Sequence, residues 1–151
     1  DMFETVARLR VPYVVMHMKG TPQNMSTLTN YNNLMKELVS YFQEKIVQLT
    51  SLGVKDIIID PGFGFAKNIE QNFYLLNHLE HLHVLGKPLL VGVSRKSMIY
   101  KTLGSSVENS LNGTTVLNTI ALLKGAHLLR VHDVKEAWEA IRLHKELKQA
   151  G

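Results

Sequence analysis

One stretch of the sequence combines a carboxylate, a cation and turn-forming glycines directly after an apolar run. It covers residues 60–67, Asp-Pro-Gly-Phe-Gly-Phe-Ala-Lys, and follows three consecutive isoleucines at 57–59. β-Branched runs are typical of buried parallel strands, and α/β proteins place their chemistry at the carboxyl ends of such strands. Asp60 there could accept two N–H donors from the edge of an aminopyrimidine ring, or it could pair with a Lys or Arg. Phe65 could stack on a flat heterocycle or serve in plain packing.

Residues 92–97, Gly-Val-Ser-Arg-Lys-Ser, form a second stretch of this kind between an apolar run and the start of a predicted helix. Helix N-termini offer free N–H groups and the positive end of the helix dipole, so they attract anions. Arg95 and Lys96 would strengthen that attraction. They could also be solvated surface charges, but their position after a buried strand and a glycine favours an anion site.

The third stretch, Arg130-Val131-His132-Asp133, also follows an apolar run. Arg130 and His132 alternate, so they point the same way if the strand continues through them. Arginine can give two parallel hydrogen bonds to a phosphate, and histidine can donate one more. We expect these two side chains to hold an anion and Asp133 to cap the next helix.

Four strand-and-helix units in succession would position these residues. The strands are expected at 13–16, 56–59, 88–91 and 127–129. One helix is expected at 32–51, and a second begins at a capping box formed by Asn68 and Gln71. A short helix at 98–103 is followed by a longer one that ends near 124. The last helix runs from 133 to near the end of the chain and is expected to bury Val134, Ala137, Trp138 and Ile141. This alternation predicts a parallel α/β sheet, either a small open sheet or half of a (β/α)8 barrel. Residues 1–9 have the apolar face of a helix but no clear start, which favours the half barrel and a chain that begins inside a longer protein.

Composition limits the function classes. The 151 residues are 45% hydrophobic, enough for one domain with a core, and they include no cysteine, which excludes disulfides and thiolate chemistry. The net charge of +4 comes from scattered Lys and Arg, which argues against nucleic acid and favours an anionic small molecule. Neither a signal peptide nor a membrane-spanning run is evident, so we expect no membrane association and a cytoplasmic location.

Together with Met16-His17-Met18-x-Gly20-x-Pro22, the three stretches resemble dihydropteroate synthase, in the order and spacing of that family. The resemblance implies a transferase of folate biosynthesis, a target of sulfonamides. Such an enzyme joins 6-hydroxymethyl-7,8-dihydropterin diphosphate to 4-aminobenzoate, with Mg²⁺ assisting, and releases 7,8-dihydropteroate and pyrophosphate. It also implies that residues 1–151 form one unit, strands five to eight of a (β/α)8 (TIM) barrel, inactive without the missing N-terminal half.

Residue roles follow from the same resemblance. Asp60, Lys96, Arg130 and His132 would be catalytic, and the pterin would contact Met16, Asp60, Phe65, Gly92, Lys96 and Arg130. Arg130 and His132 would hold the diphosphate, and Phe65 and Ser97 the aminobenzoate. The resemblance places no metal ligand in this chain, because the Mg²⁺ ligand would come from the missing half.

Two other functions stay open at this stage. One is a pterin-binding barrel of the methyltetrahydrofolate methyltransferase type, which would not need the basic strand ends. The other is a non-catalytic half barrel. In each case a half barrel would expose two strand edges and an apolar face, so we expect an oligomer, most simply a homodimer.

Overall fold

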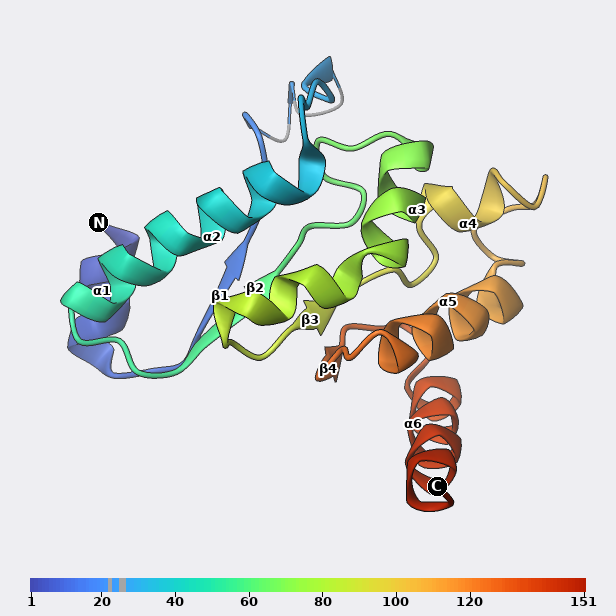
Figure 1. Cartoon of the computed structure of the whole chain (residues 1–151). Helices are drawn as coiled ribbons and strands as arrows, with labels where there is room; N and C mark the ends of the chain where they lie inside the picture. The colour runs from blue at the N-terminus through green and yellow to red at the C-terminus, as the bar shows by residue number, and fades with distance from the viewer. Residues whose placement is uncertain (22, 25–26) are drawn as a thin grey trace.

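The computed structural model describes residues 1–21, 23–24 and 27–151 (Figure 1). Pro22, part of the first motif, lies outside the described residues. In chain order the elements are α1 (Met2–Leu9), β1 (Tyr13–Met16), α2 (Leu34–Ser51), β2 (Ile57–Asp60), α3 (Ile69–Asn77), the 3₁₀ helix η2 (Leu79–Leu85), β3 (Leu90–Val91), α4 (Ser97–Tyr100), α5 (Leu111–Leu123), β4 (Leu128–Leu129) and α6 (Val134–Gln149). No helix in these ranges is long and apolar enough to cross a membrane.

All the strands are parallel and follow one another in chain order. β1 pairs with β2, with Met16 opposite Asp60, and β3 pairs with β4. A single bridge between Ile59 and Leu89 joins the two pairs. A doubly wound open sheet would reverse its strand order at a switch point, and no reversal occurs along these strands. The predicted α/β class with parallel strands is confirmed, and the strand order brings all four carboxyl ends to one edge.

The last two strands are shorter than the sequence pattern predicts. β3 covers only Leu90–Val91 and β4 only Leu128–Leu129. Pro88, which was expected to open the third strand, has no N–H to donate to a ladder. Its carbonyl still accepts a hydrogen bond of 2.9 Å from the backbone N–H of Ile59. The region therefore lies against β2 without forming a full strand.

Helices α2 and α3 cover the strands and show how local signals set helix boundaries. Leu38, Phe42 and Leu49 of α2 are fully buried in the core. At the start of α3 the capping box is confirmed, because Asn68 and Gln71 bond each other's backbone N–H at 2.8 and 2.9 Å. That helix is followed by η2. Phe73, which the pattern placed in the buried stripe, is half-buried and packs against the core.

Helix α6 corrects the prediction for the last amphipathic segment. Val134, Trp138 and Ile141 were expected to be buried, but they are 70%, 54% and 40% exposed. Ala137 is buried as predicted, and the helix packs on α5 through Ala137 and Ala140, while Figure 1 shows it projecting from the rest of the molecule. Small alanine side chains allow this close helix contact, while Val134, Trp138 and Ile141 stay exposed in the described part of the chain.

Candidate active site

The strand ends converge on a pocket of about 230 Å³. It is lined by Met16, Asp60, Phe65, Gly92, Ser94, Lys96, Arg130, Val131 and His132. Segments separated by as many as 116 positions in the chain thus contribute to one concave surface. The structure brings together seven of the eight residues predicted from sequence, and Ser97 is the exception.

Asp60 is the last residue of β2 and is 4% exposed. Its Oδ1 accepts a hydrogen bond of 2.9 Å from the Gly62 backbone N–H, and its Oδ2 lies 4.0 Å from an Nη of Arg130. Burial raises the pKa of Asp60 above its ordinary value, while the Gly62 hydrogen bond, Lys96 and Arg130 oppose that rise. The carboxylate is therefore enclosed but surrounded by donors and cations, which suits it to bind an N–H-rich edge.

Lys96 stands at the start of α4 and reaches across the pocket. Its Nζ donates to the Phe63 carbonyl and lies 4.7 Å from the centre of the Phe65 ring. Burial lowers the pKa of Lys96 to about 8, against the opposing pull of Asp60. The two aromatics of the turn differ in role, because Phe63 is buried in the core and only Phe65 lines the pocket. Phe65 thus offers a ring face beside a cation, the arrangement expected for stacking on a flat heterocycle.

Arg130 and His132 both line the pocket, but from the loop after β4 and together with Val131, so the strand does not continue through them as their alternation required. The Arg130 side chain is 63% exposed and has Asp60 as its one ion-pair partner among the described residues. His132 is fixed by Ser94, whose Oγ lies 2.8 Å from His132 Nδ1 and accepts a bond of 3.2 Å from the His132 backbone N–H. The pocket therefore has an accessible guanidinium and an oriented imidazole on one side.

Arg95 does not belong to this pocket, which corrects the prediction that it helps to bind an anion. Its backbone is left-handed (φ 54), and its guanidinium donates to both carboxylate oxygens of Asp133, from Nε at 2.9 Å and from Nη2 at 2.7 Å. It also donates to the carbonyls of Val107 and Glu108. Asp133 makes no capping hydrogen bond, contrary to expectation, because Arg95 occupies its side chain. The pair ties the loop after β3 to the start of α6.

Ser97 is the first residue of α4 and does not line the pocket. It is half-buried, and its carbonyl accepts the hydrogen bond of 3.1 Å from the Lys101 backbone N–H. The turn into the helix separates it from Lys96, its neighbour in sequence. Its assignment to the aminobenzoate stays a prediction.

A buried polar network behind the pocket was not singled out by sequence reasoning. Lys67 is 7% exposed, and its Nζ lies 3.1 Å from His17 Nδ1, 3.1 Å from the Gly62 carbonyl oxygen and 3.0 Å from the Phe65 carbonyl oxygen. Burial is the main cause that lowers the pKa of Lys67 to about 7 and that of His17 to about 3. The network anchors both carbonyls of the turn that carries Phe65. Lys67 itself, the last residue of the stretch 60–67, was the available sequence signal for this network. Nothing in the sequence shows that its side chain folds back onto the turn.

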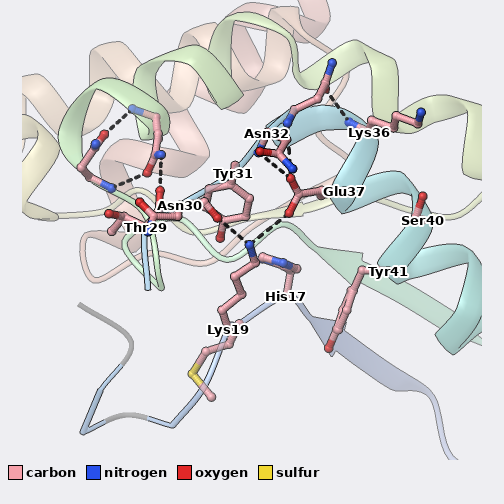
Figure 2. A pocket seen from close by; sticks show the side chains of 14 residues that line it. His17, Lys19, Thr29, Asn30, Tyr31, Asn32, Lys36, Glu37, Ser40 and Tyr41 are labelled. Atoms are coloured by element: carbon pink, nitrogen blue, oxygen red, sulfur yellow. Dashed lines mark hydrogen bonds and ion pairs between the residues drawn. The ribbon is translucent and has the colours of Figure 1, made fainter. Parts of the chain in front are cut away.

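A larger hollow of about 1150 Å³ lies beside the N-terminus of α2 (Figure 2). Figure 2 shows Lys19 reaching Glu37, an ion pair of 3.0 Å, and its ammonium lies 3.8 Å from the centre of the Tyr31 ring. Of the two lysines that line this hollow, Lys19 is paired with Glu37, and the Asn33 side chain already caps the helix at the Lys36 backbone N–H. We therefore place the chemistry in the smaller pocket, where a carboxylate and accessible cations face one space.

The chain has clear relatives among known proteins. Residues 1–132 match the family described as "Pterin binding enzyme", and the chain belongs to this family. It is 41% identical over 142 residues to the dihydropteroate synthase of Escherichia coli K12, covering 93% of this chain and 50% of that protein. It is 40% identical over 149 residues to a bifunctional dihydropteroate synthase/dihydropteroate reductase of Helicobacter pylori, covering 99% of this chain and 39% of the relative.

Solved structures give the same result. A Yersinia pestis dihydropteroate synthase with a sulfonamide drug complex superimposes with a TM-score of 0.96 at 38% identity, covering 99% of this chain and 55% of that one. The Thermus thermophilus dihydropteroate synthase in complex with 6HMPPP gives a TM-score of 0.93 at 36% identity, covering 97% and 59%. The chain thus has the fold of part of a dihydropteroate synthase and spans about half the length of the curated relatives it matches.

Proposed function

We propose that this chain forms strands five to eight, the C-terminal half, of a dihydropteroate synthase barrel. The intact enzyme would condense 6-hydroxymethyl-7,8-dihydropterin diphosphate with 4-aminobenzoate in folate biosynthesis. One observation carries the proposal: Asp60, Lys96, Arg130 and His132, from three different strand ends, line the same pocket with Phe65. The carboxylate suits the edge of a pterin ring and the cations suit a diphosphate, and these are the two parts of that substrate.

The residues that line the pocket suit two different parts of the substrate, the pterin ring and the diphosphate. Asp60 would accept hydrogen bonds from the pterin amino and ring N–H groups, and Lys96 would donate to the carbonyl side of the pterin. Phe65 and Met16 would pack against the ring, and Gly92 would line the same slot. Arg130 and His132 would hold the diphosphate, which their accessible positions allow.

The reaction we propose begins with cleavage of the carbon–oxygen bond between the pterin methylene and the diphosphate. The electron pair leaves with the diphosphate, where Arg130 and His132 stabilise the developing negative charge. The resonance-stabilised pterin cation lies near the Asp60 carboxylate. The amine of 4-aminobenzoate then attacks the methylene carbon and loses a proton, which gives dihydropteroate without an enzyme nucleophile. Ser97 and Phe65 are our candidates for contacts with the aminobenzoate.

Magnesium belongs to the proposal only for the intact enzyme. The part of the chain that the structure describes has no cluster of three His, Asp or Glu side chains able to hold a metal ion. Asp60 already accepts from Gly62 and faces two cations, which is a poor setting for a divalent metal. We propose, as the resemblance to dihydropteroate synthase implies, that the Mg²⁺ ligand lies outside residues 1–151.

The remaining half of the barrel is the partner that we propose. The apolar face of α6 is exposed, and β1 and β4 each have one neighbour among the described strands. Unpaired strand edges and apolar faces favour association, either with the complementary half or as a homodimer. Sulfonamides are proposed as inhibitors of the completed enzyme, because the Yersinia pestis relative is named as a sulfonamide complex.

The test is dihydropteroate formation from the pterin diphosphate, aminobenzoate and Mg²⁺, with the chain alone and with the remaining half of the Escherichia coli relative added. We expect activity only on addition, and its loss with Asp60→Asn. The named relatives do not favour a methyltransferase. Absence of activity from a folded, associated complex would support a non-catalytic half barrel instead.

A further inference from the structure

The contact between Ser94 and His132 determines which imidazole nitrogen carries the proton. Ser94 follows β3 and is 4% exposed, whereas His132 follows β4 and is exposed at the pocket. The Ser94 Oγ makes two contacts with His132, one to the backbone N–H at 3.2 Å and one to Nδ1 at 2.8 Å. These two bonds together limit the possible proton positions.

A serine hydroxyl has one proton to donate and two lone pairs to accept with. The backbone N–H of His132 can only donate, so it uses one lone pair of Ser94 Oγ. The hydroxyl proton then needs an acceptor, and in the described part of the chain only His132 Nδ1 lies within reach. A protonated Nδ1 would leave the buried hydroxyl proton without a partner, which is costly.

We infer that Ser94 is a positioning residue that holds His132 as the Nε2–H tautomer. Nδ1 accepts from the Ser94 hydroxyl, so Nε2 carries the ring proton. Among the described residues Nε2 has no hydrogen-bond partner, and His132 lines the pocket next to Arg130. The free N–H is thus a donor available to a ligand.

This tautomer fits the chemistry of the site. A neutral imidazole with Nε2–H donates to an anionic oxygen, whereas the opposite tautomer would present a lone pair to it and repel it. Ser94 therefore makes His132 a donor for a diphosphate without requiring a positive charge on the ring. The identity of the anion rests on the proposed function, but the tautomer itself does not.

The experiment is ¹⁵N NMR on the 151-residue chain with labelled histidine, at a pH of about 8.5, where free imidazole is neutral. His132→Gln identifies the His132 signals. We expect a protonated, pyrrole-type Nε2 and an unprotonated, pyridine-type Nδ1 in the wild type. Ser94→Ala should give a mixture of tautomers, Ser94→Thr should restore the wild-type pattern, and Ser105→Ala, at an exposed serine of a nearby loop, should leave it unchanged.

A protonated Nδ1 in the wild type would overturn the inference, as would an unchanged pattern in a folded Ser94→Ala variant. The wild-type spectrum alone suffices if Ser94→Ala does not fold. The NMR result is independent of the dihydropteroate assay. A correct tautomer with no synthase activity after the remaining half is added would reject the proposed function, and activity of that complex with the wrong tautomer would reject only the positioning role of Ser94.

Discussion

Replacing Lys67 with methionine should change the stability of the chain by an amount that depends on pH. Methionine fills similar space but removes the bonds to His17 and to the Gly62 and Phe65 carbonyls. Each buried acceptor left without a partner costs about 1–3 kcal/mol. Against this, the substitution removes a buried cation. Burial lowers the pKa of the Lys67 ammonium from 10.5 to about 7. At about 1.4 kcal/mol per pKa unit, keeping this group charged costs the folded chain about 5 kcal/mol.

The sign follows from proton binding. The folded chain releases the Lys67 proton near pH 7 and the unfolded chain near 10.5, so between these values the unfolded state binds more protons. The wild type therefore gains stability as the pH rises through this window, and Lys67→Met lacks that gain. At pH 7 and below the two effects of the substitution nearly cancel. By a pH of about 9.5 the difference should have grown by about 3 kcal/mol.

Urea unfolding followed by circular dichroism, at several values between pH 7 and about 9.5, measures the difference. Lys55→Met, at an exposed lysine, controls for loss of a positive charge. A wild-type-minus-variant difference that stays flat across this range would refute the reasoning. It would mean that Lys67 keeps its proton in the folded chain.

Four further outcomes are expected. Gly62→Ala should cost at least about 3 kcal/mol in thermal denaturation, because φ is 72 and the new Cβ would collide with a backbone carbonyl. Arg95→Ala and Asp133→Ala should each lower the thermal midpoint, and a double variant should lower it by less than the sum of the two, since both single variants remove the same ion pair. Asp60→Asn should weaken pterin diphosphate binding by the completed barrel roughly tenfold to a hundredfold in calorimetry. Trp138 fluorescence should shift to the blue when the remaining barrel half is added, and an unchanged spectrum would place that half elsewhere.

Local sequence determined the elements and the position of the chemistry. An isoleucine run next to Asp60 fixed both a buried strand and the carboxylate at its end, because a strand of such residues must be covered on both faces. The capping pair at Asn68 was readable because its two hydrogen bonds span only three residues. The alternation of strands and helices likewise predicted the α/β class. It could be read locally because the spacing of apolar residues reflects which side of a single strand or helix is buried.

Tertiary structure decided which side chains share a site. Arg95 and Lys96 are adjacent cations, yet the left-handed backbone at Arg95 sends one to Asp133 and leaves the other in the pocket. Ser94 orients His132 across 38 positions of sequence. For α6, sequence periodicity predicted four buried residues, of which Ala137 is buried and Val134, Trp138 and Ile141 are exposed. A helix reveals its apolar residues, but which of them are covered depends on the elements that pack against it.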